Sequence, residues 1–168
     1  LLSFNHAHGI TVDEIVNSAK SAWQHDKQIT TPNFSLIDTQ GNTHTNASTQ
    51  GKYLVINFWA TWCATCKVEM PSMEKLYQRF REYDFEMLTI SVDKDMSLIA
   101  PFIKEYNLTF PVLLDPDSKL AKQDYKTTGV PETFVVDKNG IIVHKAIGPR
   151  DWATDETVEA FAQLIQRD

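Results

Sequence analysis

The chain of 168 residues is long enough to form a domain with a substantial core, and 42% hydrophobic and 23% charged residues are ordinary for a globular protein. It has 16 Lys and Arg against 22 Asp and Glu, a net charge of −6 without a basic cluster, which argues against a nucleic-acid partner. No apolar run approaches the roughly 18 residues of a membrane span. The chain begins with Leu1 rather than Met, so we expect a processed or truncated product, which leaves room for a preceding signal peptide or membrane anchor.

The N-terminal part of the chain predicts a helix that precedes the main domain. Thr11-Val12-Asp13-Glu14 forms a capping box, in which the first and last side chains satisfy each other's backbone N–H groups. Apolar residues then recur at helical spacing, which predicts a helix over about 12–25. We expect residues 1–30 to be a leader and an extension helix packed on the main body, and residues 31–168 to form one domain.

The rest of the chain alternates strand-like and helix-like segments. The predicted elements are a hairpin of strands at 34–37 and 43–45, a strand at 53–59, a helix at about 63–83, a strand at 85–92, a helix at about 97–106, a strand at 112–114, a helix at about 118–125, strands at 133–137 and 141–147, and a last helix capped at Thr154. Strands interleaved with helices, followed by a late hairpin, predict an α/β fold with a mixed central sheet and helices on both faces.

The chain has only two cysteines, Cys63 and Cys66, directly after the apolar strand. Residues three apart on a helix have Cβ atoms roughly 5–6 Å apart, and a disulfide needs Cα atoms roughly 4.4–6.8 Å apart. The pair can therefore close a bridge with little backbone movement. Cys63, at the start of the helix, faces unpaired N–H groups that stabilise a thiolate. A Cys-x-x-Cys in this strand-to-helix context indicates a thioredoxin-like redox motif.

Two other interpretations of the cysteines are weaker. A structural zinc site needs four ligands, and the five histidines, with His6 and His8 as the one close pair, offer no second half-site. A purely structural disulfide would close a loop of a few residues and constrain the unfolded chain little. We expect no metal.

The motifs resemble one branch of a known superfamily. Asn-Phe-Trp-Ala-Thr-Trp-Cys-Ala-Thr-Cys-Lys-Val-Glu-Met-Pro at 57–71, with Gly-Val-Pro-Glu-Thr-Phe at 129–134, is similar to the TlpA/ResA/CcmG branch of the thioredoxin superfamily. The likeness spans about residues 32–165 and includes the leading hairpin and a helix-and-strand insert at about 97–116, which the minimal thioredoxin lacks.

The resemblance implies a thioredoxin-like fold and a periplasmic or otherwise extracytoplasmic thiol–disulfide oxidoreductase. Members of this branch reduce protein disulfides, many of them in cytochrome c maturation. It implies no cofactor beyond the Cys63–Cys66 disulfide. The implied partners are protein thiols and disulfides and an upstream membrane or thioredoxin-like electron donor, and we expect a monomer.

The resemblance also assigns roles to individual residues. Cys63 matches the exposed nucleophile and Cys66 the buried resolving thiol. Pro131, preceded by Val130, matches a cis-proline that lies beside the disulfide and offers a backbone edge to an extended substrate. Glu69 matches an active-site glutamate just after the Cys-x-x-Cys.

Four side chains near these positions have two interpretations each. Glu69 shares a helix face with Cys66, so burial would raise its pKa and let it exchange a proton with that thiol, whereas an exposed Glu69 would only complement the helix dipole. Glu132 resembles the glutamate after the cis-proline in CcmG-like members and faces either substrate or solvent. Of Trp59 and Trp62, we expect one in the core and the other over the cysteines, with Trp62 as a substrate contact.

Asn57 stands where thioredoxin has a buried aspartate that relays protons. Since asparagine does not titrate, that role moves to Glu69 or to water. A disulfide oxidase or isomerase of the DsbA or DsbC type stays an alternative, although the long helical insert of DsbA is absent. A thiol peroxidase is weaker, because Trp59 and Ala60 replace the Pro and Thr of peroxiredoxins, and so is a Sco-type metal chaperone, whose cysteines are separated by three residues.

Overall fold

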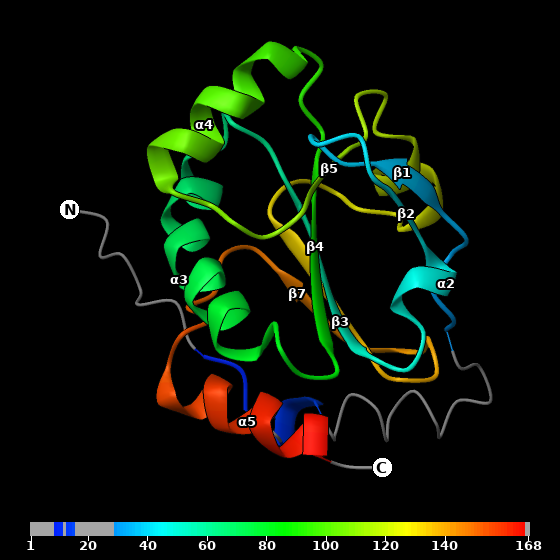
Figure 1. Ribbon diagram of the computed structural model, residues 1–168, viewed down its shortest axis with the longest axis vertical. Helices are drawn as coiled ribbons and strands as arrows, with labels where there is room; N and C mark the ends of the chain where they lie inside the picture. The colour runs from blue at the N-terminus through cyan, green and yellow to red at the C-terminus, as the bar shows by residue number, and fades with distance from the viewer. Residues whose placement is uncertain (1–8, 12, 16–28, 167–168) are drawn as a thin grey trace.

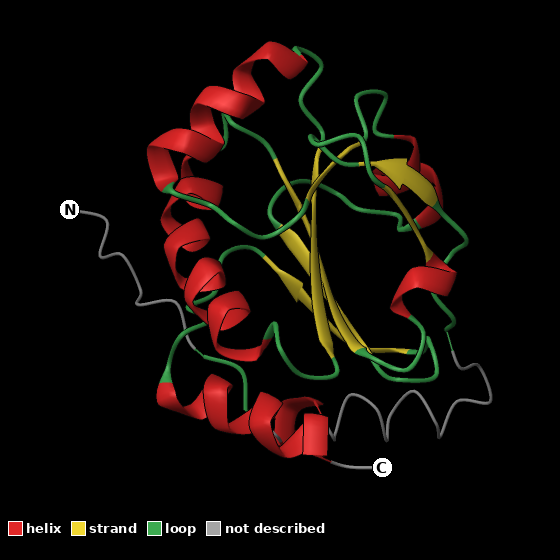
Figure 2. Ribbon diagram, viewed as in Figure 1, coloured by secondary structure: helices red, strands yellow, loops and turns green. Residues whose placement is uncertain are grey.

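A five-stranded mixed sheet forms the centre of the protein (Figures 1 and 2). The structure, a computed structural model, describes residues 9–11, 13–15 and 29–166. The sheet order is β5-β4-β3-β6-β7. Strands β3, β4 and β5 are parallel, whereas β6 and β7 pair antiparallel. The elements are β1 (Ser35–Ile37), β2 (Thr43–Thr45), α2 (Asn46–Thr49), β3 (Tyr53–Trp59), α3 (Ala64–Phe80), β4 (Phe85–Ser91), the 3-10 helix η1 (Met96–Leu98), α4 (Ile99–Tyr106), β5 (Val112–Leu114), η2 (Lys119–Asp124), β6 (Glu132–Val136), β7 (Ile142–Ile147) and α5 (Asp155–Gln166).

Different elements cover the two faces of the sheet. One hydrophobic cluster joins β3 and β4 to the three helices α3, α4 and α5, with Trp59, Met70, Phe102 and Phe161 among its members. The other joins the opposite face of the same strands to the β1–β2 hairpin and η2. Side chains alternate across a strand, so β3 contributes neighbouring residues to both clusters. The predicted mixed sheet is confirmed, and Figure 2 shows its helices on both sides.

The predicted elements occur in the predicted order, with two differences. The helix expected over 118–125 is a π-helical turn, in which Tyr125 N–H donates to the carbonyl of Leu120 at 2.9 Å. This wider turn places Leu120, Ala121 and Tyr125 together in the core, and aromatic packing of Tyr125 on Phe58 and Phe134 favours it. The single-turn helix α2 was not predicted, because one turn is too short to show a periodic pattern.

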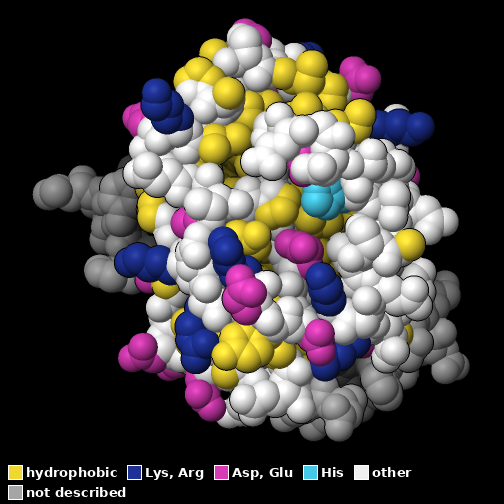
Figure 3. Space-filling model, in the orientation of Figure 1, with side chains coloured by type: hydrophobic (Ala, Val, Ile, Leu, Met, Phe, Trp, Pro, Cys, Tyr) yellow, Lys and Arg dark blue, Asp and Glu magenta, His cyan; other side chains and the backbone are white. Residues whose placement is uncertain are grey.

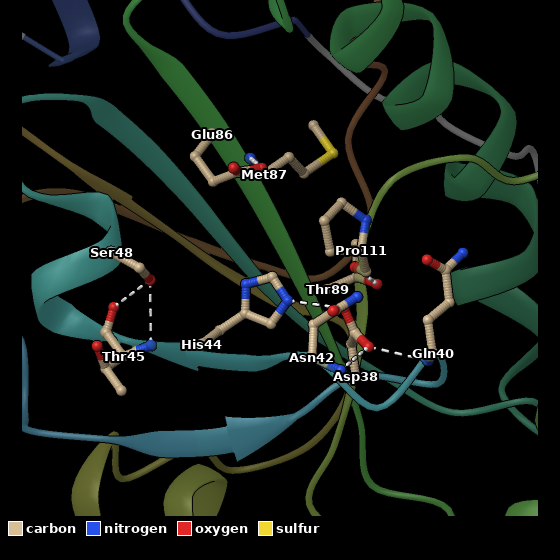
Figure 4. Close-up of polar contacts among 10 residues, drawn as sticks. All are labelled: Asp38, Gln40, Asn42, His44, Thr45, Ser48, Glu86, Met87, Thr89 and Pro111. Carbon is tan, nitrogen blue, oxygen red and sulfur yellow. Dashed lines mark hydrogen bonds and ion pairs between the residues drawn. The ribbon is translucent and has the colours of Figure 1, made fainter.

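The β1–β2 hairpin is held together by a buried carboxylate (Figure 4). Asp38 Oδ1 accepts hydrogen bonds from the backbone N–H groups of Gln40 at 2.8 Å and Asn42 at 2.9 Å, and its Oδ2 lies 2.8 Å from His44 Nε2. Burial raises the pKa of Asp38, but these hydrogen bonds outweigh it and hold the pKa below the ordinary 3.8. Asp38 also bridges to Leu113, so the hairpin covers the outer edge of β5.

The N-terminal capping box is confirmed, and the segment around it docks on α5. Thr11 N–H donates to the Glu14 carboxylate at 2.9 Å, and Glu14 N–H donates to the Thr11 hydroxyl at 3.1 Å. Ile10 is buried, and its N–H donates to the hydroxyl of Thr157 at 2.7 Å. The helix predicted over 12–25 is described only at residues 13–15, which are helical; its remainder lies outside the described residues.

Charges of the two signs are not segregated on the face drawn in Figure 3. Basic and acidic side chains are interspersed on this face, and hydrophobic side chains gather over α4. Among the described residues, no helix combines the length and the apolar character that crossing a membrane requires.

We expect Gly9→Ala to destabilise the protein by about 1–3 kcal/mol, the usual cost of overpacking. A Cβ atom at Gly9 would collide with the hydroxyl of Thr154, which caps α5 by accepting the N–H of Thr157 at 3.2 Å. Urea unfolding at equilibrium measures this cost. In a Thr154→Ala background the same change should cost less, because the colliding hydroxyl is gone; equal costs in both backgrounds would contradict the proposed close approach.

Candidate active site

Cys63 and Cys66 form a disulfide at the junction of β3 and α3, with Cα atoms 5.2 Å apart. Cys63 is the N-cap of α3, and the N–H of Cys66 points at the Cys63 sulfur at 3.2 Å. Cys63 is 6% exposed and Cys66 is fully buried. Only Cys63 is therefore open to attack from outside, while the helix N-terminus stabilises negative charge on its sulfur.

The loop before Cys63 is held by Asp93, a buried residue just after β4. Its two carboxylate oxygens accept the backbone N–H of Thr61 at 2.9 Å and the hydroxyl of Thr61 at 2.6 Å. The hydroxyl of Ser91 donates to the same carboxylate at 2.7 Å. Trp59 is fully buried against Phe102, with ring centroids 4.9 Å apart. The loop that carries the disulfide is thus held by Asp93 after β4 and by the packing of Trp59 against α4.

The loop before β6 lies against the disulfide, and Val130–Pro131 is a cis peptide bond, as predicted. The carbonyl oxygen of Val130 is 3.6 Å from the sulfur of Cys63. Trp59 lies in the core, as expected for one of the two tryptophans, and Trp62 is 68% exposed beside this loop.

Glu132 is placed differently from both interpretations made for it. Its side chain is neither solvent-facing nor open to a substrate, because it is only 1% exposed. One carboxylate oxygen accepts the backbone N–H of Thr128 at 2.9 Å and its hydroxyl at 2.8 Å, and the other lies 3.5 Å from the ammonium of Lys145. Glu132 therefore ties the loop that carries Val130 and Pro131 to β6 instead of forming part of the surface.

A groove of about 480 Å³ opens beside the disulfide, between the loop after β4, η2 and the loop before β6. Much of its wall is apolar, and Lys94, Asp95 and Lys122 add charge. Its apolar and backbone lining comes from Trp62, Val92, Leu98, Ala121, Gly129 and Val130.

Glu69 lies one helical turn beyond Cys66 and is 1% exposed. Its Oε2 accepts the backbone N–H of Arg150 at 2.8 Å, and its Oε1 accepts the side-chain amide of Asn57 at 2.9 Å. Burial raises the pKa of Glu69 from the ordinary 4.5 to about 7, although hydrogen bonds from Arg150 and Asn57, the nearby indole of Trp152 and the charge of Arg150 oppose the shift. The exposed alternative for this residue is excluded, and its carboxyl titrates where a thiol-exchange enzyme can use it.

Asn57 joins this carboxyl to the neighbouring strand. Asn57 and Thr133 are opposite each other in the antiparallel pair of β3 and β6, and the Asn57 amide donates to the Thr133 hydroxyl at 2.8 Å. Both residues are fully buried. The position of a titratable aspartate in thioredoxin is thus held by an amide that contacts Glu69.

The structure brings together all the predicted catalytic residues and adds four that sequence reasoning missed: Asp93, Thr128, Thr133 and Arg150. A polar Ser-x-Asp at the end of the buried β4 strand was the one sequence signal for Asp93. No local pattern marks Thr128 or Thr133, and none can mark Arg150, because it acts through its backbone N–H. Across the described ranges, no three His, Cys, Asp or Glu side chains group as metal ligands would, and His6 and His8 lie outside those ranges.

We expect the raised pKa of Glu69 to make folding stability fall with pH. Below pH 4.5 the carboxyl is protonated in both the folded and unfolded states, and between 4.5 and about 7 only the unfolded state loses the proton. The folded state therefore loses about 3 kcal/mol over this window and nothing more above it. Urea unfolding of the disulfide form gives the free energy of unfolding of the parent and of Glu69→Gln at pH 4 and pH 9. The parent should lose stability relative to the variant between the two pH values. A difference that does not vary with pH would show that Glu69 titrates normally.

Comparison with known proteins agrees with this site. Residues 27–145 match the AhpC/TSA family. The chain is 35% identical over 134 residues to a thiol–disulfide oxidoreductase ResA of Bacillus cereus, a match that covers 80% of this chain and 75% of that protein. To the ResA of Bacillus thuringiensis (strain Al Hakam) it is 32% identical over 165 residues, covering 98% and 92%.

Two solved structures extend the agreement to the fold. A thiol:disulfide interchange protein from Bacteroides sp. aligns with a TM-score of 0.71 and 25% identity over 84% of this chain and 91% of that one. StoA from Bacillus subtilis aligns with a TM-score of 0.66 and 24% identity, covering 77% and 96%. The chain therefore has a thioredoxin-like fold, belongs to the AhpC/TSA family and, together with its ResA relatives, is a thiol–disulfide oxidoreductase of the protein-disulfide reductase type.

Proposed function

We propose that this protein works outside the cytoplasm as a reductant of protein disulfides, with Cys63 as the attacking thiolate, Cys66 as the resolving thiol and Glu69 as the proton acceptor of Cys66. The observation that carries the proposal is the asymmetry of the pair. Cys63 keeps 6% of its surface exposed beside the carbonyl of Val130, while Cys66 is fully buried with a carboxyl of raised pKa one helical turn away.

In the first step the thiolate of reduced Cys63 attacks one sulfur of a substrate disulfide. A bond forms between Cys63 and that sulfur, the substrate S–S bond breaks, and the second substrate sulfur leaves as a thiolate. The N-terminus of α3 stabilises the attacking thiolate, because the N–H of Cys66 points at the Cys63 sulfur. The carbonyl of Val130, 3.6 Å from that sulfur, is an acceptor for the N–H of an extended substrate segment.

In the second step Cys66 releases the substrate. Its thiol passes a proton to the Glu69 carboxylate, and the resulting thiolate attacks the Cys63 sulfur of the mixed disulfide. The Cys63–Cys66 disulfide forms and the first substrate sulfur leaves as a thiolate, so that two electrons have moved to the substrate. A carboxyl with a pKa of about 7 can take this proton near neutral pH, which an ordinary glutamate does poorly.

The groove beside Trp62 supports a protein substrate. Its apolar wall can bind a hydrophobic side chain near the substrate cysteine. Its lysine and aspartate side chains can contact polar groups of the substrate around that side chain. The ResA relatives support a thiol–disulfide oxidoreductase. On the resemblance of the active-site motifs to the TlpA/ResA/CcmG branch, we place the protein outside the cytoplasm, its electron donor in the membrane or among thioredoxin-like proteins, and its substrate among the proteins of cytochrome c maturation.

We expect reduced Cys66→Ser to accumulate a mixed disulfide with insulin, because the thiol that would resolve the Cys63 adduct is missing. Non-reducing gel electrophoresis with mass spectrometry identifies the adduct. Cys63→Ser is the matched control and should form none, since Cys66 is fully buried. An adduct on Cys66 in that control, or full insulin reduction by both variants, would overturn the assignment.

The direction of the reaction has its own test. Equilibration of the Cys63–Cys66 couple with glutathione or dithiothreitol buffers should give a reduction potential more negative than about −200 mV, in the range of reductants. A value near about −120 mV, as in strong oxidases, would instead support the oxidase alternative on the same fold.

A further inference from the structure

The two oxygens of the Glu69 carboxyl have different partners, and this difference determines where its proton sits. Oε2 accepts a hydrogen bond from the backbone N–H of Arg150 at 2.8 Å. A backbone N–H can only donate, so Oε2 stays an acceptor in both protonation states of Glu69. Because a carbonyl oxygen accepts a hydrogen bond better than the O–H oxygen of an acid, this donor favours Oε2 as the carbonyl oxygen and Oε1 as the oxygen that carries the proton of neutral Glu69.

Oε1 faces the side-chain amide of Asn57. In the structure Asn57 Nδ2 donates to Oε1 at 2.9 Å and to the Thr133 hydroxyl at 2.8 Å, which suits a charged Glu69. Asn57 Oδ1 is buried without a hydrogen-bond partner among the described residues. If Glu69 carries its proton on Oε1, the O–H and the Nδ2–H groups would both be donors pointing at each other, an arrangement that costs the hydrogen bond.

An amide resolves this conflict by turning over. The two ends of an asparagine side chain have nearly the same shape, so a half-turn brings Oδ1 to the place of Nδ2. Oδ1 can then accept the O–H of neutral Glu69. The hydroxyl of Thr133 accepts from Nδ2 in one orientation and donates to Oδ1 in the other, because a hydroxyl can do both.

We propose that Asn57 is a positioning residue whose amide turns over with the proton on Glu69 Oε1, presenting Nδ2 to the carboxylate and Oδ1 to the acid. The proton comes from Cys66 in the second reaction step, so the inference rests on the proposed function for its catalytic meaning. Its geometric part stands on the contacts of Glu69, Asn57, Thr133 and Arg150 alone.

Within the described part of the chain, no other group packed against this carboxyl can follow the proton in this way. The backbone N–H of Arg150 is a fixed donor, its guanidinium is held by the carbonyls of Ile147 and Pro149, and the indole of Trp152 can only donate. The disulfide cysteines do not titrate. A turning amide keeps one hydrogen bond to Glu69 in each state, so Glu69 can gain and lose its proton without leaving a buried group unpaired on Oε1.

The test uses the full chain in its disulfide form, labelled with ¹⁵N and ¹³C, so that the thiols are silent. We follow the Glu69 carboxyl carbon and the nuclear Overhauser effects from the Asn57 amide protons to Thr133 side-chain protons between pH 5 and 9. We expect these effects to weaken severalfold as pH falls, with the same midpoint as the Glu69 carbon. Effects that stay constant while Glu69 titrates would overturn the proposal.

Glu69→Gln is the matched control, because its amide imitates the neutral acid. Arg150 N–H needs an acceptor, so the side-chain oxygen of the introduced glutamine should occupy the Oε2 position, and its NH₂ group should face Asn57 as a permanent donor. The Asn57 amide should then show the low-pH pattern of the parent at every pH. The high-pH pattern in this variant would contradict the proposal even if Glu69 of the parent stayed charged throughout.

Asn57→Leu separates this inference from the proposed function. Leucine has the same branching of heavy atoms, although it is bulkier, and it has neither polar end, so the midpoint of Glu69 should rise as the carboxylate loses its donor, and the pH profile of insulin reduction should shift in the same direction. An amide that turns in the parent, combined with a pH profile unchanged in both Asn57→Leu and Glu69→Gln, would uphold the switch and refute the role of Glu69 in turnover. If the Asn57 amide effects did not change with pH while Cys66→Ser still formed a mixed disulfide with insulin, only the turning of the amide would be refuted.

Discussion

A carboxyl group buried directly behind the disulfide is the constraint on which this active site depends. Removing a carboxylate from water costs several kcal/mol unless the protein supplies hydrogen bonds, and here three elements contribute to them. α3 carries Glu69, β3 supplies the Asn57 amide, and the loop before α5 supplies the backbone N–H of Arg150. The donors lower the cost of the charge without removing it, which leaves a carboxyl that titrates near neutral pH.

The same constraint explains why the loop before α5 is so closely fastened to α3. Ser72 accepts the N–H of Trp152 at 3.0 Å and donates its own hydroxyl proton to the Glu69 carbonyl at 2.8 Å. Trp152 is fully buried. These contacts fix the backbone of Arg150 relative to the helix, so its N–H meets Glu69 through rigid neighbours. The Oε2 side of the carboxyl is therefore held by a backbone donor in a fixed place.

Two further buried carboxylates, those of Asp93 and Glu132, position the loops on either side of the disulfide. Asp93 holds the loop before Cys63 from the end of β4, and Glu132 holds the loop that carries Val130 from the start of β6. Because β3 lies between β4 and β6, these two loops flank the β3–α3 junction at one end of the central strands. Each acid accepts both a backbone N–H and a hydroxyl from the loop it holds, which fixes the loop in position and orientation. The sulfur of Cys63 and the carbonyl of Val130 are thereby kept facing each other.

Short-range patterns in the sequence were sufficient for the order of the elements, the capping box at Thr11, the redox pair and the assignment of Glu69 to the face of Cys66. Each of these depends on residues a few positions apart, whose relative placement follows from helix and strand geometry. The sequence could not show that Glu132 is buried, that η2 widens to pack Tyr125, or that Asn57 meets Thr133. Asn57 and Thr133 are 76 positions apart, and Glu69 and Arg150 are 81 apart, so only the packing of the sheet brings them together. The identity of the reacting atoms was therefore local information, whereas the burial and hydrogen bonds that set their proton affinity arose only in the tertiary structure.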